Sequence, residues 1–155
     1  MPVQPIFLEH KLFAKKDGDI SHKFEEIGAD VNAFTSFNET MFYCSGIDHT
    51  PKMIDLLFEL VGQPYFTKQN IAKEAPIITQ ELAMYKNDPI WGLNNAIMTE
   101  MFGHSNLGIE VVGTEKSIAS VNKSNLLMLI VRIMSQQKCS LLHVVISQIT
   151  KLRRS

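Results

Sequence analysis

The apolar residues at the start of the chain recur at helical spacing. Residues 4–14 carry apolar side chains at helix-like positions and run into the Gly-containing turn AKKDGD, which predicts a helix that closes there. Asp19 can cap a second helical segment that ends at Gly28. The apolar positions of that segment are Ile20, Phe24 and Ile27. Two short helices are therefore expected before Val31.

From Val31 the pattern becomes typical of strands. Residues 31–37 and 40–47 are rich in Val, Phe, Thr and Tyr, and Asn38 and Glu39 separate them. Such runs on either side of turn-forming residues predict an antiparallel hairpin. Alternation divides the first run between two faces, with Asn32, Phe34 and Ser36 on one and Ala33, Thr35 and Phe37 on the other.

Three longer helical segments follow the hairpin. They span about 51–62, which has Pro51 in its first turn, about 67–87, and 88–103, which Asp88 can cap. Pro76 predicts a bend or a late start in the second segment. The apolar face of that segment comprises Ile71, Ile78, Leu82 and Tyr85. The large apolar side chains around the third segment are expected in the core rather than against a cofactor: Met84, Trp91, Met98, Met101 and Phe102.

The end of the chain shows neither the helical nor the strand period. The apolar residues of 126–155 follow neither spacing cleanly, and the longest apolar run, Leu126 to Ile133, is interrupted by Arg132. This run is far shorter than the roughly 20 residues that a membrane helix needs. No membrane span is therefore expected.

Composition limits which binding partners and which cellular compartment are expected. The 155 residues suit one domain, and 15 basic against 16 acidic residues leave a formal charge of -1. No whole-chain field draws such a protein to nucleic acid or to an anionic membrane. Two distant cysteines and a start without a secretory signal favour the reducing cytoplasm.

Glu9 and His10 stand side by side in the apolar stretch PIFLEHKLF. Zinc hydrolysis needs three protein ligands, a metal-bound water and a carboxylate that takes the proton of that water. Two histidines four residues apart on a helix, with a glutamate beside them, supply two ligands and the base. The residue four positions before His10 is Ile6, so one ligand is missing. By themselves, Glu9 and His10 are more often a partly exposed polar pair than a metal site.

The surrounding residues resemble a known family. In order and at suitable spacing, four blocks are similar to the catalytic amino-terminal domain of the pitrilysin or insulinase family, an inverzincin family of zinc metallopeptidases with the motif H-x-x-E-H. The blocks are FLEHKLF, GDISHKFEEIGADVNAFTSFNETMFY, PYFTKQNIAKEAPIITQELAMYKNDP and GTEKSI. The similarity is closest to a bacterial, processing-peptidase-like branch and covers about Phe7 to Val121.

The resemblance implies roles for four residues. Glu9 matches the general base, His10 the second zinc ligand and Glu81 the third. Glu74, seven residues before Glu81 and so on the same helical face, matches a glutamate that supports the site. Ile6 departs from the family at the first zinc ligand, which predicts negligible peptidase activity.

The resemblance also implies the substrate site and the fold. Asn32 and Ala33 match the strand along which an extended peptide adds its backbone. The expected fold is α+β, with helices on one face of a mostly antiparallel sheet that lacks its last strands. The unpaired edge of such a sheet favours self-association. The other histidines have no ligand spacing and are expected at the surface or in caps: His22, His49, His104 and His143.

The two ends of the chain suggest a shifted reading frame. Permitted codons for PVQPIF, read in another frame, spell G-A-A-H-F and place a histidine where the family has its first ligand. Permitted codons for residues 133–150 likewise spell a segment similar to the family's Y-x-P-x-N-M block and the strand after it. We therefore expect one incomplete domain over 1–155, family-like over about 7–128, with Met1 to about Ile6 and about Leu129 to Ser155 out of frame.

Three functional hypotheses follow from the residues and the resemblance. The first is a zinc-dependent metalloendopeptidase lineage that is inactive because one ligand and the second half of the family's fold are missing. The second is a noncatalytic partner subunit of a peptidase pair. The third is a gene fragment without function. The expected partners are a peptide and a paired peptidase-family subunit.

Overall fold

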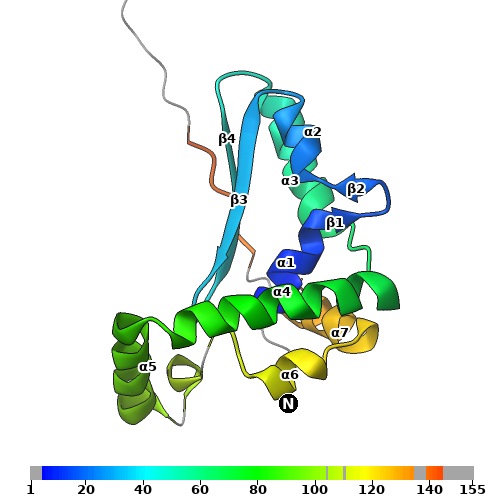
Figure 1. Ribbon diagram of the computed structural model, residues 1–155. Coiled ribbons are helices and arrows are strands. Elements are labelled where there is room, and N and C mark those ends of the chain that lie inside the picture. The colour runs from blue at the N-terminus through cyan, green and yellow to red at the C-terminus, as the bar shows by residue number, and fades with distance from the viewer. Residues whose placement is uncertain (1–4, 104, 110, 135–138, 145–155) are drawn as a thin grey trace, which may run out of the picture.

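The computed structural model describes residues 5–103, 105–109, 111–134 and 139–144. Figure 1 shows its elements, which confirm the α+β class. Along the chain they are α1 (Pro5–Phe13), β1 (Ala14–Lys15), β2 (Gly18–Asp19), α2 (Ser21–Glu25), β3 (Ala29–Thr35), β4 (Thr40–Gly46), α3 (Thr50–Gly62), α4 (Lys68–Lys86), α5 (Pro89–Phe102), the 3-10 helix η1 (Asn106–Gly108), α6 (Glu115–Ala119) and α7 (Lys123–Met134).

The strands β3 and β4 form the predicted antiparallel hairpin. Their register runs from Ala29 opposite Gly46 to Thr35 opposite Thr40, and the Ser36 amide donates to the Glu39 carbonyl across the turn at 2.8 Å. The helices α1, α2 and α3 contact this hairpin on one side (Figure 1). Burial follows the predicted alternation, because Ala33 and Thr35 are half-buried while Asn32 and Phe34 are exposed.

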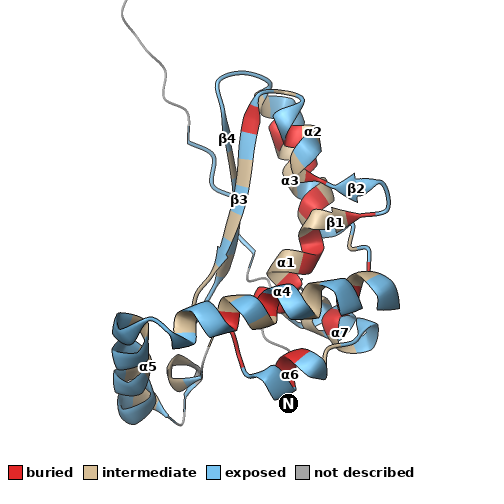
Figure 2. Ribbon diagram, in the orientation of Figure 1, coloured by how far each residue is buried: buried red, intermediate tan, exposed pale blue. Residues whose placement is uncertain are grey.

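One apolar core joins α1, α3, α4 and α7. Its fully buried side chains include Phe7, Leu60, Ile78 and Leu126, and Figure 2 shows buried positions along α1, α3 and the inner side of α4. The predicted apolar face of α4 is confirmed: Ile71, Ile78 and Leu82 are buried and Tyr85 packs against the core. Such burial supplies most of the free energy that holds short helices in place.

The helix α4 continues through Pro76, so the predicted late start is wrong. It begins at Lys68, behind a capping box in which the Thr67 side chain accepts from the Asn70 amide, and ends at Lys86. Pro76 is exposed, so its ring meets no other element. The buried residues on either side of it hold both halves of the helix against one core.

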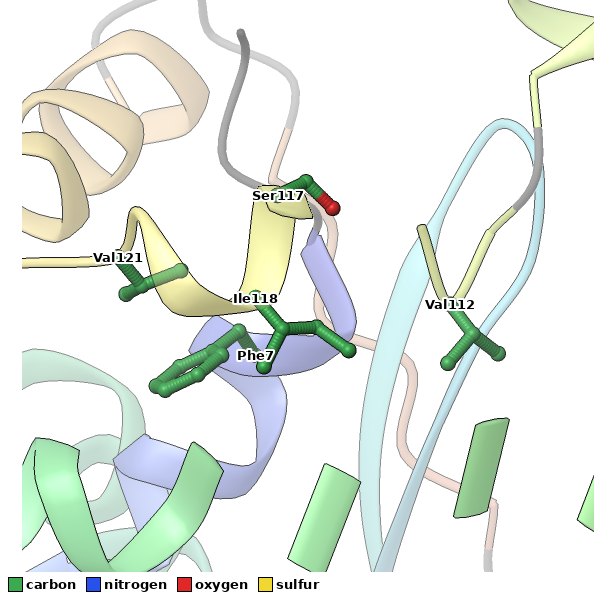
Figure 3. A pocket seen from close by; sticks show the side chains of 5 residues that line it. All are labelled: Phe7, Val112, Ser117, Ile118 and Val121. Atoms are coloured by element: carbon green, nitrogen blue, oxygen red, sulfur yellow. The ribbon is translucent and has the colours of Figure 1, made fainter. Parts of the chain in front are cut away.

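The helix α6 covers the start of α1. Figure 3 shows Phe7 together with Ile118, Val121 and Val112, and the Ser117 hydroxyl donates to the Thr114 carbonyl at 2.8 Å. The pocket that these five side chains line has no volume that a water molecule could enter. It is therefore part of the packing of the core and cannot bind a ligand.

The prediction that the large apolar side chains of α5 and of neighbouring Met84 lie in the core is wrong. No residue of α5 is buried, Met84 and Met101 are 70% and 67% exposed, and Trp91 stacks on Tyr85 with ring centroids 5.6 Å apart. Figures 1 and 2 show why: α5 projects from the end of α4 and packs mainly against α4 and η1. Its Asp88 cap is present, since Asp88 Oδ1 accepts from the amides of Ile90 and Trp91.

The helix α7 shows that the start of the final segment does have a helical period, so the expectation of no period was wrong there. Its residues at helical spacing pack against the core: Leu126, Leu129, Ile130 and Ile133. The period is hard to see because Leu127, Met128 and Val131, on the other side of the helix, are apolar as well and point to solvent. Residues 139–144 form neither helix nor strand, and the rest of 135–155 lies outside the described residues.

Candidate metal centre

The helix α1 directs His10 toward α4 and Glu9 toward the end of the hairpin. Ile6, Phe7 and Leu8 are buried, whereas Glu9 and His10 are half-buried. One turn separates Ile6 from His10, so their side chains lie on the same face of the helix.

His10 lies between two carboxylates of α4. Its Nδ1 is 3.2 Å from Glu74 Oε1, and its Nε2 is 3.2 Å from Glu81 Oε2. Glu74 and Glu81 are two turns apart, which places them on the same helical face, as their spacing predicts. The hydrogen bond that His10 Nδ1 donates to Glu74 raises the pKa of His10, although burial acts against it, and the charge of Glu81 raises it further.

Glu74 has a second cationic partner that sequence reasoning missed. The Lys11 ammonium, only 2% exposed, donates to Glu74 Oε2 at 3.0 Å. Burial favours the neutral carboxyl of Glu74, but the hydrogen bonds from His10 and Lys11 together outweigh it and lower the pKa of Glu74. The sequence signal for this contact is a lysine placed between apolar residues on a helix, where a charge needs a partner.

Glu9 faces the end of the hairpin. The Thr35 hydroxyl donates to Glu9 Oε2 and is also 3.2 Å from the Thr40 hydroxyl. Burial raises the pKa of Glu9, while the hydrogen bond from Thr35 and the charge of His10 act to lower it. Sequence reasoning placed Thr35 on the same face as Ala33 but assigned it no role, because no local pattern shows that β3 ends above α1.

Asn32 and Ala33 lie on β3, two or three residues before Thr35. Asn32 is exposed, and its Oδ1 accepts from the backbone amide of Ala33 at 2.8 Å. In the described part of the chain, β3 pairs with β4 alone, so its other edge carries no strand. His22, His49 and His143 are exposed as expected, and His104 lies outside the described residues.

Known proteins are similar to this chain in sequence and in fold. A model of the insulinase family (peptidase family M16) matches residues 6–115. The chain belongs to the insulinase family. Over 117 residues it is 39% identical to the uncharacterized zinc protease YmfH of Bacillus subtilis (strain 168). The aligned residues make up 76% of this chain and 27% of YmfH.

Two crystal structures extend the comparison with the insulinase family. An M16-like peptidase from Alicyclobacillus acidocaldarius superposes with a TM-score of 0.77 and 30% identity, over 83% of this chain and 30% of the peptidase. A peptidase M16 inactive domain from Pseudomonas fluorescens gives a TM-score of 0.73 at 19% identity, which shows the fold alone. The chain thus spans less than a third of the lengths of YmfH and the Alicyclobacillus peptidase.

The described residues fit the zinc of the family's proteases only in part. Two ligands of a tetrahedral zinc, each about 2.0–2.1 Å from the metal, stand about 3.3–3.4 Å apart. The 3.2 Å between His10 Nε2 and Glu81 Oε2 agrees with this spacing. Ile6 is apolar and 7% exposed, however, and no three His, Cys, Asp or Glu side chains of the described residues are arranged to hold a metal ion. A complete three-ligand site is therefore not present in this part of the chain.

The described residues form one larger groove, which lies apart from the candidate residues. A groove of about 460 Å³ lies between the first half of α4 and the start of α7, and none of the candidate residues lines it. No helix in the described ranges combines the length and apolarity that crossing a membrane requires.

Proposed function

We propose that this chain carries the centre of a zinc-dependent metalloendopeptidase from which one ligand is missing, and that it does not hydrolyse peptides as it stands. The observation that carries the proposal is the position of His10 between Glu74 and Glu81, with Ile6 one turn away at the position of the family's first ligand. Names of relatives such as YmfH support a zinc protease lineage.

The roles proposed for the side chains follow their contacts. Glu74 is held ionised by Lys11 and accepts from His10 Nδ1, which leaves His10 Nε2 directed toward Glu81. An outer carboxylate of this kind orients a ligating histidine. Glu9 is the proposed base, and its raised pKa suits a group that accepts a proton near neutral pH.

The proposed substrate is an extended peptide that pairs with β3. The edge of β3 at Asn32 and Ala33 carries no strand in the described part of the chain, and an added strand would take backbone hydrogen bonds there. The Asn32 side chain now holds the Ala33 amide. A bound peptide would have to replace this contact, so Asn32 can regulate access to the edge.

A noncatalytic subunit is the second candidate. The replacement of a ligand by the buried Ile6 favours a chain that binds peptide beside a catalytic partner of the same family. The retention of Glu9, His10 and Glu81 favours the first proposal. For either function we propose a cytoplasmic location, in keeping with Cys44 and Cys139, which are not joined by a disulfide.

The substitution Ile6→His tests the proposal. If the rest of the centre is intact, the variant should retain about one zinc ion per chain after gel filtration, as measured by elemental analysis, while the natural chain retains none. Ile6→Leu is the matched control for packing at this buried position. Adding Glu81→Gln to Ile6→His should abolish the gain, because the third ligand is lost. An Ile6→His variant that folds and binds no zinc contradicts the proposal.

The nucleotide sequence tests the origin of Ile6. We propose that Met1 to about Ile6 and about Leu129 to Ser155 were read out of frame, which would make the chain a fragment of a longer peptidase gene. Codons around Ile6 that spell G-A-A-H-F in the second frame support this origin. Codons that cannot spell it make Ile6 a genuine replacement and favour the noncatalytic subunit.

A further inference from the structure

Thr35 joins the hairpin to the centre. It is the last residue of β3, it stands opposite Thr40 in the register, and it is half-buried above α1. Its hydroxyl donates to Glu9 Oε2 and contacts the Thr40 hydroxyl at 3.2 Å. Three side chains from α1, β3 and β4 therefore form one hydrogen-bonded row.

The direction of the row follows from the number of protons available. An ionised carboxylate only accepts, and a hydroxyl has one proton to donate. When Glu9 is ionised, Thr35 must donate to Glu9, so Thr40 must be the donor to Thr35. Glu9 Oε2 is thereby occupied, whereas Glu9 Oε1 has no hydrogen-bond partner among the described residues.

We propose that Thr35 is a positioning residue for Glu9. Its hydroxyl, supported by Thr40, fixes Oε2 and leaves Oε1 as the oxygen that takes a proton. The inference rests on the proposed function for the role of Glu9, and it extends that function by naming what orients the base.

The position of Thr35 couples the base to the substrate strand. Thr35 lies two residues after Ala33 on the same strand, so a peptide added along Asn32 and Ala33 stiffens the segment that holds Glu9. Thr35 and Thr40 are the last strand pair before the turn, which the hydrogen bond from the Ser36 amide to the Glu39 carbonyl closes.

The orientation of Glu9 is measured without any metal. Three-bond couplings from nuclear magnetic resonance report whether the Glu9 χ1 and χ2 angles occupy one rotamer. We expect one rotamer in the natural chain and in Thr35→Ser, and averaged couplings in Thr35→Val, which keeps the shape and removes the hydroxyl. Thr79→Val is the matched control, since the Thr79 hydroxyl bonds only the Ala75 carbonyl on α4. Unaveraged couplings in folded Thr35→Val overturn the proposal.

Two further measurements separate this proposal from the proposed function. If Thr35→Val does not fold, Thr40→Val removes only the hydroxyl behind Thr35 and should average the same couplings in part; an unchanged Glu9 then counts against the proposal. Failure of Ile6→His to bind zinc would contradict the proposed function and leave the coupling test of Thr35 valid.

Discussion

At the scale of single residues, His10 decides the electrostatics of the centre. Three carboxylates, those of Glu9, Glu74 and Glu81, gather around one imidazole and the buried ammonium of Lys11. Since the three carboxylates repel one another, a charged imidazolium of His10 stabilises their arrangement.

The stability of the chain should depend on the protonation of His10. Because the folded-state pKa of His10 is raised above its ordinary value of 6.5, the stabilisation is fully present below pH 6.5 and is lost as the pH rises through the folded-state pKa. Glu81→Gln removes one of the two carboxylates that favour the charged ring. We expect the free energy of unfolding to fall by about 1 kcal/mol over this window in the natural chain, and by less in Glu81→Gln.

Urea unfolding at a series of pH values measures this difference. The exposed pair of His22 and Glu25 has the same sign, but it is common to both proteins and cancels in the comparison. Identical pH profiles for the natural chain and Glu81→Gln would show that His10 and Glu81 do not interact in solution.

At the scale of elements, Lys15 connects the small β1–β2 sheet to the end of α3. Its ammonium donates to the carbonyls of Glu59, Leu60 and Gln63 at 2.8–3.0 Å, at the end of the helix where backbone acceptors lack a helical partner. Burial lowers the pKa of Lys15 to about 8, and the charge of Glu59 acts against this shift. A lysine that is 9% exposed thus serves as a C-terminal cap.

The substitution Lys15→Met should destabilise the chain. It keeps most of the side-chain volume and removes the ammonium that the carbonyls of Leu60 and Gln63 accept from, which costs about 1–3 kcal/mol, while the Glu59 carbonyl keeps the Gln63 amide as a donor. Lys16→Met, at the neighbouring exposed position, is the matched control and should change the free energy of unfolding by less than about 0.5 kcal/mol. Equal urea midpoints for the two variants would rule out the cap.

The longer helices show what an apolar pattern can and cannot predict. The spacing of Ile71, Ile78 and Leu82 identified the buried face of α4 correctly. The apolar residues of α5 have similar spacing, yet Ile90 and Leu93 remain 70% and 62% exposed because no element of the described structure lies over that side of α5. Period identifies a helix, but burial depends on the neighbouring elements.

At the scale of the whole molecule, each of the two sheets contains two strands in the described part of the chain. The outer face of the β3–β4 hairpin exposes Phe34, Met41 and Tyr43 by 42–44%. The strand β4 contains no charged residue and no proline, which are the usual means of protecting an edge.

The chain should therefore associate with itself through this hairpin as concentration rises. Tyr43→Lys places a charge on the exposed face of β4 and should lower the weight-average sedimentation coefficient toward that of a monomer. Phe58→Lys is the matched control, because Phe58 is a 61% exposed apolar residue on α3 outside the hairpin. A natural chain that sediments as a monomer at every concentration, or an equal effect of both substitutions, would contradict this expectation.

The sequence by itself determined α1 to α5, the β3–β4 hairpin and the family, because local spacing and a chain of specific blocks carry that information. It also proposed Glu9, His10, Glu74 and Glu81 as the candidate centre, and their roles stay a prediction. It could not determine that Thr35 and Lys11 reach Glu9 and Glu74, that α5 projects from the body, or that one side of α7 joins the core. Those contacts link residues distant along the chain, such as Lys11 and Glu74, and depend on how α1, α4 and the hairpin pack. Only the tertiary structure brings such groups together, since no local spacing encodes the angle at which two elements cross.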